Sequence, residues 1–163
     1  MTVEELLAQQ EIRDVLAAYC RAIDRMDAEL LASVYHPDAT DDHGAYKGLA
    51  AGFVDWVMPI LARFDSTTHF SGNSLIRVDG DVAHSESYTI AYHRRDRSGG
   101  GKEDWILAVR YVDRFELRQG AWKIARRVCV FDWQRIDAVG EGSALGRDWA
   151  VGHRDRLDPV YRQ

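Results

Sequence analysis

The sequence predicts a single α+β domain in which N-terminal helices wrap a curved antiparallel sheet with a cone-like interior. Apolar residues recur at three- and four-residue steps up to about residue 63, which is a helical period. From Ser66 onward the segments are long and rich in β-branched and aromatic residues, and turn signals separate them. The 163 residues suit one domain. We assign residues 1–135 to it.

The first helix is predicted over about the first 25 residues. One face of this segment carries a stripe of apolar side chains, namely Ile12, Val15, Leu16, Tyr19, Ile23 and Met26. Thr2 and Glu5 have the spacing of a capping box, in which each residue satisfies a free N–H of the other at the helix start. The segment therefore has both a helix N-terminal signal and an apolar face that can pack against the core.

Two shorter helices are predicted next. The first covers residues 28–35 and is expected to stop at Pro37, because proline cannot continue the hydrogen-bond ladder. Residues 38–46 then form a turn, with or without a short strand. The other helix covers residues 49–63, and Pro59 inside it predicts a kink or a break.

Four long strands follow, over residues 67–78, 82–94, 105–117 and 122–134. Between them stand Asp79-Gly80-Asp81, the glycines at 99–101 and Gln119-Gly120, and such turns predict an antiparallel meander. An apolar concave face cannot remain in water, so the helices should cover it. A ligand pocket would form in that interior. Residues 136–163 are expected to be a tail that packs on the domain or on a neighbouring subunit, or else a mobile terminus.

Composition limits the possible partners. The net charge is −5 and the pI about 5.6, which argues against a nucleic-acid groove. No apolar run reaches the roughly 18 residues that cross a bilayer, and the acidic start lacks the features of a secretory signal. We therefore expect a cytoplasmic protein without nucleic-acid or membrane partners. Cys20 and Cys129 have no metal or redox spacing and are expected to be free thiols.

Five short motifs, in this order, resemble those of the SnoaL-like branch of the nuclear transport factor 2-like superfamily. They are the segments 19–24 (YCRAID), 35–39 (YHPDA), 66–70 (STTHF), 110–115 (RYVDRF) and 122–124 (WKI). The likeness covers residues 5–135. It implies the α+β barrel of that superfamily and homo-oligomers, dimers or trimers, that pair through the outer face of the sheet. Enzymes of this branch include scytalone dehydratase, bile acid 7α-dehydratase and hexachlorocyclohexane dehydrochlorinase, and they use no cofactor.

The resemblance implies a catalytic pair of Asp24 and His69. In the similar enzymes an Asp near the end of the first helix orients a His on the first long strand, which acts as general base. A neutral imidazole can take a proton near pH 7, and a carboxylate on its other nitrogen fixes the tautomer and stabilises the imidazolium. The alternative is a core histidine and an ordinary aspartate at a helix C-terminus.

Tyr19 and Arg127 are candidates for stabilising a departing oxygen or an anionic intermediate. Tyr19 matches a pocket tyrosine of the similar dehydratases, and its alternative is a core tyrosine. Arg127 matches an arginine beside the leaving group in the dehydrochlorinase. Strand alternation places Arg127, Cys129, Phe131 and Trp133 on one face, which should point inward. The alternatives for Arg127 are an exposed side chain or an ion pair with Asp132 or Asp113.

The remaining substrate-binding candidates are Tyr46, His43, Tyr92, Phe131 and Trp56. His43 and Tyr46 lie on the segment that covers the pocket in the similar proteins. Tyr92 stands where some of those proteins keep a second polar catalytic group, unless the register shifts and His93 serves. His84-x-Glu86 and Asp41-Asp42-His43 do not complete a set of metal ligands, so we expect neither a metal nor a cofactor.

Taken together, these residues predict a cofactor-independent lyase or dehydratase, or an isomerase, that uses His–Asp acid–base chemistry. The expected substrate is a hydrophobic, hydroxylated aromatic or polycyclic small molecule. The alternative is a non-catalytic ligand-binding or structural subunit, such as the small subunit of an aromatic-ring dioxygenase.

Overall fold

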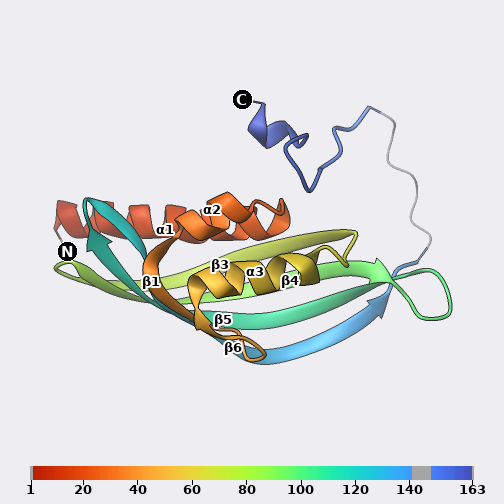
Figure 1. Cartoon of the computed structure of the whole chain (residues 1–163), viewed down its shortest axis with the longest axis horizontal. Coiled ribbons are helices and arrows are strands. Elements are labelled where there is room, and N and C mark those ends of the chain that lie inside the picture. The colour runs from red at the N-terminus through yellow and green to blue at the C-terminus, as the bar shows by residue number, and fades with distance from the viewer. Residues whose placement is uncertain (1, 141–147, 163) are drawn as a thin grey trace.

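The structure is a computed structural model that describes residues 2–140 and 148–162 (Figure 1). Its elements in chain order are α1 (Val3–Asp24), α2 (Ala28–Ser33), β1 (Tyr35–Asp42), β2 (Lys47–Leu49), α3 (Ala50–Leu61), β3 (Ser66–Asp79), β4 (Val82–Asp96), β5 (Lys102–Arg118), β6 (Ala121–Ala138) and a short 3₁₀ turn, Pro159–Tyr161. The helices lie on one side of a long, curved sheet, as Figure 1 shows. The predicted α+β architecture is confirmed.

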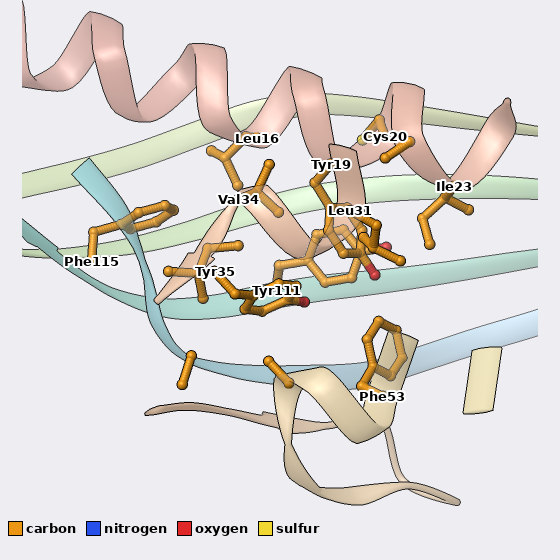
Figure 2. Close-up of a cluster of buried hydrophobic side chains, with 14 of the residues drawn as sticks. Leu16, Tyr19, Cys20, Ile23, Leu31, Val34, Tyr35, Phe53, Tyr111 and Phe115 are labelled. Atoms are coloured by element: carbon orange, nitrogen blue, oxygen red, sulfur yellow. The ribbon is translucent and has the colours of Figure 1, made fainter. Parts of the chain in front are cut away.

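Helix α1 begins with the predicted capping box. The Thr2 hydroxyl accepts a hydrogen bond from the Glu5 N–H, and the Glu5 carboxylate accepts one from the Thr2 N–H at 2.7 Å. The helix lies across the sheet and packs mainly on β3 (Figure 1). Its apolar stripe meets side chains from α2, α3 and β5 in the core, which Figure 2 shows. Burial of this apolar stripe provides most of the free energy that holds α1 on the sheet.

The sheet has the order β2-β1-β6-β5-β4-β3. Strands β3 to β6 form the predicted antiparallel meander, with turns at Gly80, at Gly99–Gly101 and at Gly120. These glycines have positive φ angles, 59° at Gly80 and 78° at Gly120, which residues with a side chain rarely adopt. β1 runs parallel to β6, which is the one parallel pairing among the described strands, and antiparallel to β2.

The segment around Pro37 differs from the prediction. Helix α2 ends at Ser33, and residues 35–42 form β1, an eight-residue strand instead of a helix end and a turn. The β1–β6 register shifts between Tyr35 and Thr40, and Pro37 lies inside this irregular stretch, where its missing N–H costs no regular ladder bond. Pairing with β6 therefore decides the conformation here.

Helix α3 continues through Pro59 to Leu61. Pro59 is in the last turn, and the Ala62 N–H still donates to the Met58 carbonyl at 3.0 Å. A proline this near the C-terminus removes one helical hydrogen bond without stopping the helix earlier. The predicted break inside residues 49–63 is therefore absent.

The described part of the tail contacts the ends of the helices. Arg154 donates hydrogen bonds to the main-chain oxygens of Leu61 and Phe64, at 2.9 and 2.6 Å, just after α3. Asp158 forms an ion pair with Arg25 at the end of α1, at 3.3 Å. No helix in the described residues is both long enough and apolar enough to cross a membrane.

Candidate active site

The predicted pair of Asp24 and His69 is in direct contact. Asp24 is the last residue of α1, and His69 is the fourth residue of β3, which packs against that helix. The Asp24 carboxylate lies 2.7 Å from the His69 Nδ1 and accepts the His69 backbone N–H at 2.8 Å. It also accepts the Thr67 hydroxyl at 2.9 Å. Three donors therefore satisfy a carboxylate whose side chain is only 13% exposed.

This contact determines which nitrogen of His69 is free. An ionised carboxylate can only accept hydrogen bonds, so the Nδ1 of His69 must carry the proton that Asp24 accepts. In the neutral ring the other nitrogen, Nε2, then keeps its lone pair. His69 is thus oriented as a base, and Asp24 can stabilise the imidazolium that forms when it takes a proton.

A second histidine, His93, lies beside this pair. His93 is opposite Thr67 in the β3–β4 ladder, and its ring centroid is 5.4 Å from that of His69, with the rings nearly perpendicular. Its Nδ1 is 3.3 Å from the main-chain oxygen of Trp105, so that nitrogen carries the proton. Burial and the neighbouring His69 lower the pKa of His93 to about 4. The ring is therefore neutral near pH 7, with a free Nε2.

Strand alternation explains why His93 occupies the position expected of Tyr92. Tyr92 pairs with Thr68 and Ile106, lies on the outer face and is 42% exposed. The next residue, His93, therefore points to the inner face. Tyr92 therefore does not face the interior, and its predicted contact with a substrate stays a prediction. Thr67 and His69 lie on the inner face of β3, and the residues opposite them in the hairpin are His93 and Ala91. Strand alternation combined with this hairpin register would therefore have identified His93 from the sequence.

The inner face of β6 changes at a bulge. Arg127, Cys129 and Phe131 pair with residues on the inner face of β5, as predicted. The register then shifts, and Trp133 pairs with Ala108 on the opposite face. The prediction that Trp133 shares their face is therefore wrong. Phe131 is 59% exposed and so lies outside the buried interior.

Arg127 is fully buried and pairs with Asp113 through two parallel hydrogen bonds of 2.8 and 2.7 Å. Its guanidinium carbon lies 4.0 Å from the ring centroids of both Tyr19 and Tyr111. Burial disfavours its charge, but Asp113 holds the pKa of Arg127 well above the ordinary value. Of the alternatives left open, the ion pair with Asp113 is the one found, and it neutralises this cation.

Tyr19 lies in the core, 1% exposed, with its ring edge-on to those of Tyr35 and Tyr111. Burial raises the pKa of its phenol above the ordinary value, so the hydroxyl stays protonated near pH 7. The structure brings Tyr19 together with Arg127, two candidates that lie 108 positions apart in the sequence.

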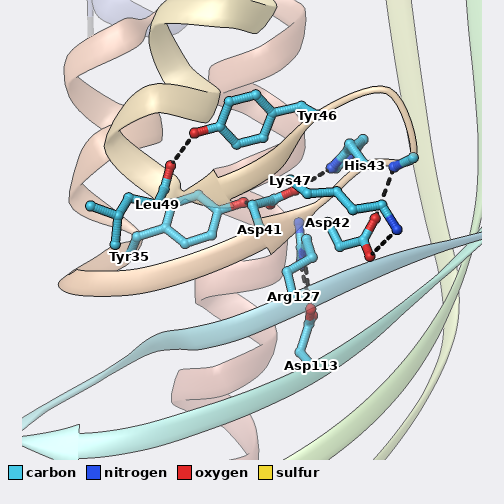
Figure 3. A network of polar contacts seen from close by, with 10 residues as sticks. Tyr35, Asp41, Asp42, His43, Tyr46, Lys47, Leu49, Asp113 and Arg127 are labelled. Carbon is cyan, nitrogen blue, oxygen red and sulfur yellow. Dashed lines mark hydrogen bonds and ion pairs between the residues drawn. The ribbon is translucent and has the colours of Figure 1, made fainter.

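A second acid–histidine pair lies on β1 and the turn after it (Figure 3). The Asp41 carboxylate lies 2.5 Å from the His43 Nδ1 and accepts the Tyr35 hydroxyl at 2.6 Å. The His43 ring stacks on Phe53 of α3, with centroids 4.5 Å apart. Burial opposes the charge of His43, but the hydrogen bond that its Nδ1 donates to Asp41, together with the nearby Cys129, raises its pKa to about 9. Sequence reasoning had considered Asp41 only as a metal ligand.

Tyr46 and Trp56 belong to an aromatic cluster formed by α3 and the segment that joins β1 and β2. Their ring centroids are 5.7 Å apart, and both rings lie about 6 Å from that of Phe53. The Tyr46 hydroxyl donates to the Leu49 main-chain oxygen at 2.6 Å (Figure 3). A side chain at Gly52 would come within 2.3 Å of that hydroxyl, so glycine is needed there. Both candidates are half-buried and adjoin His43 through Phe53.

No group of three or more His, Cys, Asp or Glu side chains within residues 2–140 and 148–162 is arranged to hold a metal ion. The arrangement instead supplies two oriented imidazoles, His69 and His43, each backed by a carboxylate. Such pairs transfer protons or activate a neighbouring group.

Comparison with known proteins gives a family and a fold. The profile of the SnoaL-like domain matches residues 4–128. An uncharacterized protein of Mycobacterium tuberculosis is 30% identical over 131 residues, which cover 78% of this chain and 88% of that protein.

Two solved structures share the fold. A type 2 hexachlorocyclohexane dehydrochlorinase, LinA, superposes with a TM-score of 0.74 at 18% identity, over 86% of this chain and 96% of its own. A candidate scytalone dehydratase from Novosphingobium aromaticivorans gives a TM-score of 0.70 at 21% identity, over 90% and 97%.

Proposed function

Because this chain belongs to the SnoaL-like domain family, we propose that it is a cofactor-independent lyase that eliminates water from a hydrophobic, hydroxylated small molecule. The observation that carries the proposal is the 2.7 Å contact between Asp24 and the His69 Nδ1, which leaves Nε2 as a base. Named dehydratases and dehydrochlorinases share the fold and support elimination chemistry.

The reaction needs an acidified C–H bond, because an imidazole is a weak base. A hydroxyl group β to a carbonyl satisfies this. His69 Nε2 takes the proton from the carbon next to the carbonyl, the C–O bond to the hydroxyl breaks, and a C=C bond forms. The imidazolium returns the proton to the departing hydroxide, so water leaves and His69 becomes neutral again. Asp24 stabilises the imidazolium between these two steps.

His93 positions the substrate in this proposal. Its neutral ring offers a free Nε2 that can accept a hydrogen bond from the substrate hydroxyl. Phe64 and Trp105 lie 5.0 and 5.5 Å from its ring, which favours an aromatic or polycyclic substrate. Tyr19 and Arg127 are buried in the core and Arg127 is already paired with Asp113, so this proposal assigns neither of them a contact with the substrate.

The test is a panel of β-hydroxy ketones with aryl or polycyclic groups, followed by the ultraviolet absorbance of the conjugated product. His69→Ala should lower kcat/KM about 100-fold or more and retain the circular dichroism of the native fold. His84→Ala is the matched control, because His84 is exposed on the outer face of β4. Turnover by His69→Ala at the native rate would reject the mechanism.

A role as an oligomeric subunit has its own supporting observation. Exposed apolar side chains gather on the outer face of β3 to β6, namely Phe70, Leu75, Tyr88, Tyr92, Val112 and Trp133. Patches of this kind commonly mark protein interfaces. We propose that copies of the chain associate through this face. Light scattering after gel filtration should show a dimer or trimer for the native protein. The Tyr88→Glu variant should be a monomer in the same measurement. A monomeric native protein would reject the association.

A further inference from the structure

Arg154, in the C-terminal segment of residues 148–162, lies beside the candidate active site. Its Nη1 donates hydrogen bonds to the main-chain oxygens of Leu61 and Phe64, at 2.9 and 2.6 Å. The ring centroid of Phe64 is 5.0 Å from that of His93, which in turn is 5.4 Å from that of His69. Phe64 and His93 therefore link Arg154 to the proposed base.

The same segment also contacts the end of α1, which carries the other half of the catalytic pair. Asp158 forms an ion pair at 3.3 Å with Arg25, the residue that follows Asp24. Arg154 and Arg25 line a cavity of about 250 Å³, whose lining also includes Met26. This cavity is therefore bordered by the C-terminal segment and by the residues directly after Asp24.

One edge of the Arg154 guanidinium has no partner. Its Nε and Nη2 are buried and form no hydrogen bond with any described residue. In Arg94 and Arg127 the same two nitrogens donate to the two oxygens of a carboxylate, that of Asp104 and that of Asp113, at 2.7–2.8 Å. Buried N–H groups normally have partners, because a donor that loses water without replacement is costly. The edge that is free in Arg154 is thus the edge with which this protein holds carboxylates elsewhere.

The charge of Arg154 is not balanced by a carboxylate in contact with it. Burial lowers the pKa of Arg154, and Asp24 and Asp65 offset this effect only in part. By contrast, the carboxylate that binds Arg94 raises the pKa of that residue. An arginine stays protonated near pH 7 in either case. A monoanionic group on the free edge would neutralise this cation, and it would meet less repulsion from Asp24 than a dianionic phosphate.

We propose that Arg154 binds a carboxylate of the substrate through Nε and Nη2, so that the substrates are hydrophobic β-hydroxy ketones that also carry a carboxylate. The proposal rests on the lyase function proposed above and adds the group that orients the substrate. Two parallel N–H groups match the two coplanar oxygens of a carboxylate, whereas a single carbonyl oxygen would leave one of them unpaired. Arg154 transfers no proton, and the elimination at His69 proceeds as described.

The site is closed in this conformation. The His69 side chain is 8% exposed, and the Nε and Nη2 of Arg154 are buried. In the proposal the segment around Arg154 opens at the cavity to admit the substrate and then closes over its carboxylate. Exclusion of water strengthens the ion pair, because the local dielectric constant falls.

The first experiment measures binding without turnover, by isothermal titration calorimetry. The ligands are 4-butanoylbenzoate and its neutral counterpart 4-butanoylbenzamide, which lack the hydroxyl group and so cannot be dehydrated. The native protein should bind the carboxylate about tenfold more tightly than the amide, or better. Arg154→Gln should bind both ligands alike, with the affinity for the amide unchanged. Arg162→Gln, at an exposed position of the same segment, should keep the native preference.

Arg154→Lys keeps the positive charge but lacks the two-pronged edge, so its preference for the carboxylate should be intermediate. Equal affinities of the native protein for the two ligands would overturn the proposal. Parallel losses for both ligands in Arg154→Gln would also overturn it, because they would show that Arg154 only holds the segment in place. The comparison within the native protein decides the question even where Arg154→Gln does not fold.

Turnover separates this inference from the lyase proposal. The kcat/KM for dehydration of 4-(3-hydroxybutanoyl)benzoate should exceed that of the corresponding benzamide about tenfold. His69→Ala should lose turnover of both and keep the binding preference. Equal kcat/KM values for the two compounds would reject the role of Arg154 and leave the lyase proposal intact. Selective binding of the carboxylate without any turnover would support the carboxylate site and reject the lyase.

Discussion

Asp24 holds His69 at two points, at the ring Nδ1 at 2.7 Å and at the backbone N–H at 2.8 Å. The contact joins the last residue of α1 to the fourth residue of β3, so helix packing sets the imidazole position directly. A side chain fixed through both its ring and its backbone has little freedom to reorient. This rigidity is the property that a general base requires.

Asp24→Asn should separate orientation from charge. The amide fits the same space but cannot stabilise an imidazolium, so kcat for elimination should fall about 100-fold with a modest loss of Tm. Asp14→Asn, at an exposed position of the same helix, is the control and should leave kcat unchanged. Equal kcat values for Asp24→Asn and the native protein would show that Asp24 has only a structural role.

His93 should make the fold less stable in mild acid. Its pKa falls from 6.5 in the unfolded chain to about 4 in the fold, mainly through burial. Between these values the unfolded chain binds a proton that the folded protein excludes, so stability decreases as pH falls from 6.5 to 4. The loss is of the order of 3 kcal/mol. The unfolding free energy, measured by urea titration at pH 7, 6 and 5, should depend less on pH for His93→Phe than for the native protein. The same pH dependence in both proteins would contradict this assignment.

Protonated His43 should stabilise the fold near neutral pH, and this stabilisation should be lost in mild alkali. Its pKa rises from 6.5 to about 9, because the hydrogen bond that it donates to Asp41, together with the nearby Cys129, outweighs burial. The folded protein then binds the proton more tightly, so this stabilisation is complete below pH 6.5 and is lost as pH rises to 9. Its size is of the order of 3 kcal/mol. His43→Gln should reduce the fall in unfolding free energy between pH 6.5 and 9.5, measured by urea titration.

The buried pair of Arg127 and Asp113 predicts strong coupling. Arg127→Met or Asp113→Asn alone leaves the partner without a charge of opposite sign in the core, at a cost of about 3–5 kcal/mol of unfolding free energy. The double variant should lose clearly less unfolding free energy than the two single variants lose in sum. A double-mutant cycle in guanidinium chloride measures this difference, and additive losses would mean that the two groups do not interact.

The resemblance and local patterns anticipated much of the site. The capping box, the apolar stripe of α1 and the turns at Gly80 and Gly120 depend on residues close in sequence, and each was identified from spacing alone. The pairing of Asp24 with His69 came from the motifs of the family. The capping box, the stripe and the turns could be predicted because neighbouring residues determine their conformation.

Only the tertiary structure decided the rest. β1 is a strand because β6 pairs with it, a bulge in β6 turns Trp133 to the outer face, and the hairpin between β3 and β4 places His93 beside His69. The same parallel pairing brings Asp41 to Arg127, 86 positions along the chain. A one-residue shift in pairing exchanges the two faces of a strand. The spacing of residues within one segment does not show whether such a shift occurs.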